Sequence, residues 1–209
     1  MAAIRAITLD LDDTLWEMLP VIRRAEQALR DWLAEHYPRT MELFPAPKVM
    51  ELRQAVMLEY PERVHDLTFL RHEVIYRMGV ESGYPDIHVA AAFDVFDRHR
   101  NTLELFPDVR PALTSLRERF RLVALTNGNA RLDLIGIDDL FDEFVSARTA
   151  GAAKPAVQIF EAGVEAGGSS AAETLHVGDH PELDVHGARE AGLQATWMNR
   201  IGATWPDHL

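Results

Sequence analysis

The 209-residue sequence contains no cysteine, and this absence removes two kinds of site at once. Disulfide bridges and thiolate zinc centres both need cysteine sulfur, so neither contributes to this chain. The absence is compatible with a reducing cytosol. A chain of this length can bury a sizeable core without cross-links.

Basic residues and long apolar runs are also scarce. The chain has 21 Lys and Arg against 33 Asp and Glu, a formal net charge of -12. Nucleic acids and anionic membranes are bound by clustered cations, so this balance argues against both partners. No apolar run approaches the roughly 18 residues of a membrane span, and the N-terminus lacks a basic segment followed by a signal-like core. We therefore expect a soluble cytoplasmic protein.

What is present is an ordinary globular composition. Hydrophobic residues make up 47% and charged residues 26%, which is typical of a folded soluble protein rather than a disordered one. The length exceeds one modal domain and falls short of two, which predicts one core domain carrying an insertion. The sequence carries no signal for the oligomeric state.

Short apolar runs that end in polar residues predict buried strands of a parallel sheet. Four runs have this form, at residues 6–10, 122–126, 174–178 and 195–198. Helical stretches separate the last three, and that alternation is typical of a doubly wound, Rossmann-like α/β sheet. A helix is predicted to begin after Asp108, with Asp108 as its cap and Pro111 in its first turn.

Between the first strand and that helix the apolar residues keep a helical period from residue 20 to about residue 99. No convincing strand interrupts them. The breaks predict about four helices, and they fall at Pro38, Pro45, Pro47, Pro61, Gly83 and Pro85. We therefore expect an all-α cap domain over residues 16–100, inserted into a core made of residues 1–15 and 101–209.

The segment Leu9-Asp10-Leu11-Asp12-Asp13 crowds three carboxylates into four residues, which is unfavourable without a cation. Strand alternation places Asp10 and Asp12 on one side if the extended backbone persists. Both come after the first strand, where open α/β sheets bind ligands. Alone, however, such a pair is more often a strand-end turn in which Asp12 caps the segment after it.

Three more polar features fall at predicted strand ends or nearby loops: Thr126-Asn127, Lys154, and Asp179 with Asp184. Taken singly, each is better explained as a turn, a helix cap or a solvated side chain. Together they bring two carboxylate pairs, a hydroxyl and an ammonium to one edge of a sheet. That joint arrangement predicts an active site.

The sequence resembles the haloacid dehalogenase superfamily of aspartyl-nucleophile hydrolases. The four family motifs match at Asp10-Leu11-Asp12-Asp13-Thr14, at Thr126-Asn127, at Lys154, and from Gly178-Asp179 through Asp184. The resemblance covers nearly the whole chain, and the helical insertion matches the family's cap between the first and second motifs. It implies a Rossmann-like core, dependence on Mg²⁺, and phosphoryl transfer through a phosphoaspartate.

The resemblance also implies a role for each matching residue in hydrolysing a small phosphate monoester. Asp10 is the expected nucleophile, Asp12 the general acid and base, and Lys154 the catalytic cation. Thr126 and Asn127 are expected to bind the substrate phosphate. Mg²⁺ is expected on Asp10, Asp12 and Asp179, with Asp184 in support of Lys154 or of the metal shell. The metal would make the crowding of carboxylates tolerable.

Several alternatives stay open at this stage. A halide leaving group needs no proton, and the resemblance implies that dehalogenases lack an acid at the position of Asp12, so a phosphatase is favoured over a dehalogenase. Asp12 and the large insertion argue against a regulatory module phosphorylated on Asp10, because a switch gains nothing from fast hydrolysis. A catalytically silent binding protein is the other alternative. Short segments are similar to the family's bacterial hydrolases of FMN and of the phosphoribitylaminouracil intermediate, which implies a flavin-pathway substrate.

Overall fold

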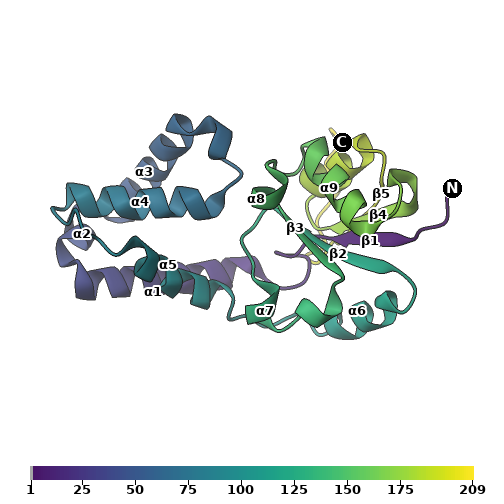
Figure 1. Ribbon diagram of the computed structural model, residues 1–209, viewed down its shortest axis with the longest axis horizontal. Coiled ribbons are helices and arrows are strands. Elements are labelled where there is room, and N and C mark those ends of the chain that lie inside the picture. The colour runs from purple at the N-terminus through teal and green to yellow at the C-terminus, as the bar shows by residue number, and fades with distance from the viewer. Residues whose placement is uncertain (1) are drawn as a thin grey trace. The chain divides into compact units, whose positions relative to one another are not determined.

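The computed structural model describes residues 2–209, which divide into two compact units. One unit joins residues 2–18 to residues 104–209, and the other is Leu19–Leu103. Figure 1 shows that the first contains the sheet and that the second is built from helices.

The first unit is organised around a five-stranded sheet (Figure 1). Its strands are β1 (Ala6–Leu9), β2 (Arg121–Thr126), β3 (Glu143–Ser146), β4 (Thr174–Gly178) and β5 (Gln194–Trp197). They lie in the order β3-β2-β1-β4-β5, and every neighbouring pair is parallel. All four residues of the central strand β1 are buried, which explains why it appears in the sequence as a continuous apolar run. The predicted doubly wound fold is confirmed.

Helices cover both sides of this sheet. The helices of the unit are α6 (Val109–Arg117), α7 (Leu132–Ile135), α8 (Ala147–Ala150), α9 (Val157–Gly167) and α10 (Gly187–Glu190). Helices α6 and α9 lie on opposite sides of the strands (Figure 1). Short 3₁₀ turns, η2 (Asp138–Leu140) and η3 (Ala171–Glu173), and a π-helical segment, η4 (Pro181–His186), complete the unit. The π-helical segment comes shortly after β4.

Tight packing holds α9 on the sheet. Its buried residues Ile159 and Phe160 share a core cluster with Leu125 of β2. A Cβ atom added to Gly163 would lie 3.1 Å from the Leu125 side chain and 3.2 Å from that of Thr8 on β1. The small residue therefore lets the helix approach the two central strands closely.

The structure differs from the sequence-based predictions at two places in this unit. The sequence pattern missed β3, because only Val145 and Ser146 of this short edge strand are buried and its apolar run is too brief to register. Asp108 does stand at the N-cap position of α6, but its carboxylate accepts a hydrogen bond from Arg200 at 2.8 Å instead of capping the helix.

The second unit is entirely helical. It contains α1, which begins at the unit boundary (Met18–His36), α2 (Pro38–Leu43), α3 (Ala46–Glu59), α4 (Leu67–Glu81) and α5 (Val89–Arg100), with a 3₁₀ turn, η1 (Pro61–Arg63). Its own core includes Leu33, Phe44, Val56, Ile75 and Phe96. The short α2 is additional to the predicted helices, because it fits between the breaks at Pro38 and Pro45.

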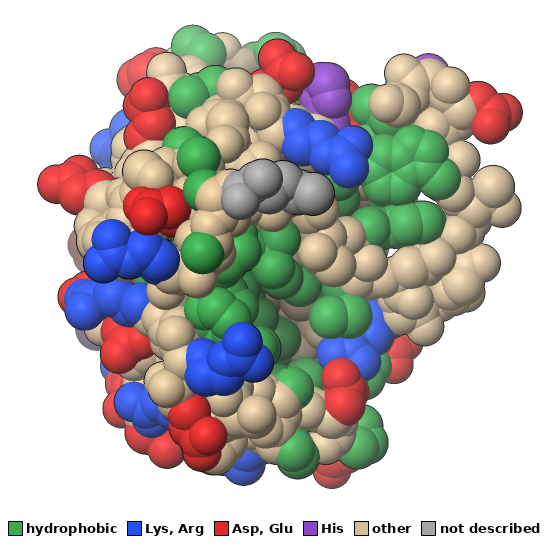
Figure 2. Space-filling model, turned by 90° about the vertical axis from the view of Figure 1, so that its right-hand side faces the viewer, with side chains coloured by type: hydrophobic (Ala, Val, Ile, Leu, Met, Phe, Trp, Pro, Cys, Tyr) green, Lys and Arg blue, Asp and Glu red, His purple; other side chains and the backbone are tan. Residues whose placement is uncertain are grey.

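The charge distribution on the surface and the lengths of the helices bear on binding to nucleic acids and membranes. On the face drawn in Figure 2, Lys and Arg side chains are interspersed with Asp and Glu, so the side chains visible there form no continuous basic field. Within residues 2–209, none of the helices combines the length and the apolar character needed to span a membrane.

Candidate active site

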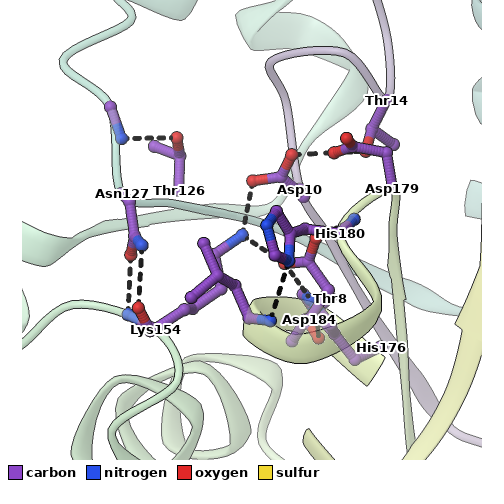
Figure 3. A network of polar contacts seen from close by, with 12 residues as sticks. Thr8, Asp10, Thr14, Thr126, Asn127, Lys154, His176, Asp179, His180 and Asp184 are labelled. Carbon is purple, nitrogen blue, oxygen red and sulfur yellow. Dashed lines mark hydrogen bonds and ion pairs between the residues drawn. The ribbon is translucent and has the colours of Figure 1, made fainter. Parts of the chain in front are cut away.

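Parallel pairing brings the ends of three strands to one edge of the sheet. Asp10 follows β1, Thr126 ends β2 and Asp179 follows β4. The backbone N–H of Asp10 donates to the carbonyl of Val177 at 2.9 Å, which continues the pairing of β1 with β4 by one residue. Figure 3 shows the polar side chains converging at this edge, with Lys154 reaching in from the segment before α9.

Lys154 is a buried cation between two carboxylates. Its ammonium donates to Oδ1 of Asp10 and, at 2.6 Å, to Oδ1 of Asp184. The three residues are 5%, 7% and 1% exposed, respectively. Burial by itself would lower the pKa of Lys154, but the attraction of Asp10 and Asp184 outweighs it and raises that pKa. Lys154 therefore stays charged in the site.

Both oxygens of the Asp184 carboxylate accept hydrogen bonds. Oδ1 accepts from Lys154 and from Nε2 of His176 at 3.1 Å, and Oδ2 accepts the backbone N–H of His180 at 2.9 Å. Burial opposes ionisation, yet the hydrogen bond from His176 and the charge of Lys154 hold the pKa of Asp184 well below its usual range. Asp184 is thus an ionised partner of Lys154.

Gly178 makes room for that carboxylate. A Cβ atom on Gly178 would lie 2.3 Å from Cγ of Asp184, far inside any van der Waals contact. A side chain at this position would displace Asp184 from Lys154. The presence of glycine at this position of the fourth motif therefore has a direct steric explanation.

Asp10 lies in an environment that disfavours its ionised form. Burial raises the pKa of Asp10 to about 7; Lys154 opposes the rise, while Asp184 and Asp12 add to it. Oδ2 of Asp10 lies 3.2 Å from the hydroxyl of the buried Thr14, which is equally far from Oδ1 of Asp179. One hydroxyl proton serves only one of these carboxylates at a time.

Asp10, Asp179 and Asp184 form a group suited to a cation. One carboxylate oxygen from each lies within 4.8 Å of those of the other two. Two of the three, Asp10 and Asp184, bond the Lys154 ammonium. Burial together with the charges of Asp184 and Asp13 raises the pKa of Asp179. Oxygen donors of this kind suit a hard divalent ion. Because Asp184 already accepts three hydrogen bonds, Asp10 and Asp179 are the better direct ligands.

Asp12 was predicted as an acid, a base and a metal ligand, and its carboxylate lies outside this group of three. Its Oδ1 accepts the indole N–H of the fully buried Trp16 at 2.8 Å. Asp13 adopts a positive φ of 59° and accepts the backbone N–H of Met18, so the extended backbone ends here. Contributions of Asp12 to catalysis and to metal binding stay predictions.

Thr126 and Asn127 occupy the end of β2, but they differ in their contacts. The Thr126 hydroxyl accepts the backbone N–H of Gly128 at 2.9 Å. The Asn127 amide forms two bonds with the backbone of Lys154, donating to its carbonyl at 3.0 Å and accepting its N–H at 2.7 Å (Figure 3). The Asn127 side chain therefore holds the Lys154 segment in place, and the contribution of Asn127 to substrate binding stays a prediction.

Sequence reasoning gave no role to two residues of this site, Thr14 and His176. Thr14 lies within the first motif and is buried between Asp10 and Asp179. His176 is buried within β4 and contacts Asp184. A signal for His176 was present in the sequence, because a histidine inside an otherwise apolar strand needs a polar partner.

Comparisons with known proteins agree with this geometry. A family model described as haloacid dehalogenase-like hydrolase matches residues 4–192. The chain is 33% identical to the 5-amino-6-(5-phospho-D-ribitylamino)uracil phosphatase YigB of Escherichia coli, covering 100% of this chain and 91% of that protein. It is 30% identical to a glyceraldehyde 3-phosphate phosphatase of Methanopyrus kandleri, over 94% of this chain and 84% of the relative.

A solved structure is also similar. The crystal structure of a 2-haloacid dehalogenase from Pseudomonas syringae pv. Tomato matches with a TM-score of 0.94 and 37% identity, covering 99% of this chain and 91% of that one. Phosphatases and a dehalogenase therefore both occur among relatives that span the chain.

Proposed function

Because this chain belongs to the haloacid dehalogenase-like hydrolases, we propose that it hydrolyses a small phosphate monoester through a phosphoaspartate on Asp10, with Mg²⁺ as cofactor. The observation that carries the proposal is the group of carboxylates on Asp10, Asp179 and Asp184, two of which bond the Lys154 ammonium. Without a cation this group repels a phosphate dianion, and with one it attracts it. A haloacid substrate gives no comparable reason for so much negative charge.

The chemistry assigned to the chain is consistent with these contacts. An Asp10 oxygen bonds to phosphorus as the ester oxygen leaves, and Asp12 gives that oxygen its proton. Asp12 then takes a proton from water, which attacks phosphorus and frees Asp10. Lys154 and Thr126 hold the phosphoryl oxygens, and Asn127 keeps the Lys154 backbone in place. Asp10 and Asp179 would hold the Mg²⁺, which would supply positive charge for the phosphoryl oxygens.

The substrate class rests on the relatives. Both phosphatases named above act on phosphate esters of small polyhydroxy or carbonyl compounds, according to their names. We extend the proposal to a flavin-pathway phosphate, FMN or 5-amino-6-(5-phospho-D-ribitylamino)uracil, on the similarity to the Escherichia coli enzyme. We also propose that the helical unit is the cap of this family and selects the leaving group.

A direct comparison of substrates tests the proposal. The purified protein is expected to release phosphate from a chromogenic aryl phosphate and from FMN in Mg²⁺, and to lose this activity in EDTA. It is expected to release no chloride from 2-chloropropionate, because Asp12 and the carboxylate group are suited to phosphoryl transfer. Phosphate is measured by a molybdate assay and chloride by ion chromatography. Chloride release without a metal requirement would replace the proposal by a dehalogenase, and no turnover of either substrate would favour a binding role.

Mg²⁺ is expected to raise the melting temperature more at pH 8 than at pH 6. In the metal-free protein the pKa of Asp10 is raised from 3.8 to about 7, so the folded state holds a proton that the unfolded chain releases. The stabilisation of the folded state by this proton is complete in acid and is lost as the pH rises from about 4 through about 7. Mg²⁺ competes with that proton, which makes its apparent affinity about tenfold higher at pH 8 than at pH 6. Melting curves at several Mg²⁺ concentrations measure this.

The matched control for this titration is Asp10→Asn, which has no proton to displace. Its Mg²⁺-induced shift should be smaller and should vary little between the two pH values. An equal shift at both pH values in the wild-type protein would show that Asp10 is not the group with which the metal competes.

A further inference from the structure

His176 connects the interior of the sheet to the proposed catalytic lysine. It lies on β4 opposite Thr8 of β1 and is fully buried. Its Nδ1 is 2.8 Å from the Thr8 hydroxyl, and its Nε2 is 3.1 Å from Oδ1 of Asp184. Figure 3 shows this path running from Thr8 through His176 and Asp184 to Lys154.

The charges around His176 determine which ring nitrogen carries the proton. Burial, and then the charge of Lys154, lowers the pKa of His176, so the ring is neutral. Asp184 is ionised and only accepts hydrogen bonds, so Nε2 must be the protonated nitrogen. The unprotonated Nδ1 then accepts from the Thr8 hydroxyl. Each hydrogen bond along the path therefore has a defined donor and acceptor.

This arrangement fixes Asp184, which stands on a less regular element. Asp184 belongs to the six-residue π-helical segment η4, a form that is rare and is seen mostly as short interruptions at functional sites. His176 belongs to a strand of the sheet that pairs with neighbours on both sides. The hydrogen bond from Nε2 thus attaches a carboxylate on an irregular segment to a rigid strand, and the same Oδ1 accepts from Lys154.

Packing alone gives no reason for an imidazole at this position. The ring contacts Phe160 edge to face, with centroids 5.2 Å apart, and a leucine or phenylalanine would offer the same apolar contact. Burying an imidazole costs free energy unless its nitrogens are hydrogen-bonded. Both nitrogens here have partners, and one partner is the carboxylate that holds Lys154.

We propose that His176 is a positioning residue: in its neutral Nε2–H form, with Nδ1 bonded to Thr8, it fixes the Asp184 carboxylate so that the Lys154 ammonium stays directed at Asp10. The consequence for turnover rests on the proposed function, whereas the proton position and the order of Lys154 do not. Loss of the Nε2 donor would leave Oδ1 of Asp184 with Lys154 alone, so that the carboxylate would be held less firmly, by Lys154 on Oδ1 and the His180 N–H on Oδ2. Lys154 would then lose a fixed partner.

Nuclear magnetic resonance of the whole protein tests the geometry without any substrate. The ¹⁵N shifts of the His176 ring, assigned by their loss in His176→Gln, should show a neutral ring protonated on Nε2. The chain has only two lysines, Lys48 and Lys154, so the ammonium signal of Lys154 is assigned by comparison with Lys48→Met. That signal should be protected from exchange in the wild type and in His176→Gln, and broadened or lost in His176→Leu. A ring protonated on Nδ1, or a Lys154 signal unchanged in His176→Leu, would overturn the proposal.

Kinetics test the consequence for turnover. His176→Leu should lower kcat for aryl phosphate by about 10- to 100-fold with little change in KM, because Lys154 acts on charge that develops in the transition state. His176→Gln keeps an N–H donor for Asp184 and should recover most of that loss. A purely structural histidine would instead make kcat follow the melting temperature across the two variants. If the wild type has no phosphatase activity, the proposed function fails, and the resonance data alone decide on His176.

Discussion

Asp10→Asn is expected to abolish turnover of phosphate esters, with a loss on the order of 10⁴-fold or more in kcat/KM. The amide cannot act as the nucleophile that accepts the phosphoryl group, and none of the other carboxylates replaces it. Asp179 and Asp184 lie close by, but Asp184 is filled by three donors. Phosphate release from an aryl phosphate under saturating Mg²⁺ measures the loss.

The Asp10→Asn protein should remain folded, which separates lost chemistry from lost structure. Burial makes the ionised form of Asp10 unfavourable, and a neutral amide removes that penalty. The amide oxygen can still accept from Lys154, which also keeps its bond to Asp184. We therefore expect a metal-free melting temperature at or above that of the wild type. Activity within tenfold of wild type would exclude Asp10 as the nucleophile.

Lys154→Met should have the second-largest effect, and it should reduce both activity and stability. The Lys154 ammonium is a buried cation that forms ion pairs with Asp10 and Asp184. Its removal leaves these two carboxylates without that positive charge. Breaking a buried ion pair from one side destabilises by about 3–5 kcal/mol. The loss of positive charge next to the phosphoryl oxygens should lower kcat by about 10²- to 10³-fold. Urea denaturation and steady-state kinetics measure the two effects.

The chain supplies a matched control in its other lysine. Lys48 lies in the helical unit with its ammonium 4.2 Å from the centre of the Phe44 ring. Lys48→Met should keep activity and nearly all stability. The double variant Lys154→Met with Asp184→Asn should regain stability, because one unpaired charge is removed, but it should not regain activity. Equal activities of Lys154→Met and Lys48→Met would remove Lys154 from the mechanism.

The sheet and the position of the site were predictable from the sequence because both depend on pattern. Strands β1, β2 and β4 are buried strands whose apolar runs are visible in the sequence. Parallel strands end at one edge, so the residues that come after them are expected together. This reasoning anticipated that Asp10, Thr126 and Asp179 would lie near one another. The same reasoning did not predict the edge strand β3, because a half-exposed strand has a shorter apolar run in the sequence.

The side-chain contacts inside the site were not predictable in the same way. That Asn127 holds the backbone of Lys154, and that Asp12 accepts from Trp16, depends on the path of two loops and on rotamers. Spacing along the chain does not determine either. The contact between His176 and Asp184 likewise depends on the π-helical segment η4, which no periodicity in the sequence indicates.

The central claim is that the Asp10 carboxylate carries the phosphoryl group during turnover, and mass spectrometry of acid-quenched protein tests it most directly. Asp12→Asn is the protein to use with an aryl phosphate: the leaving group needs no acid, while the second step lacks its base, so the intermediate accumulates. The account predicts one added phosphoryl group, located on Asp10 by fragmentation of its peptide. A phosphoryl group on another residue, or a burst of phenolate with no covalent adduct, would contradict it.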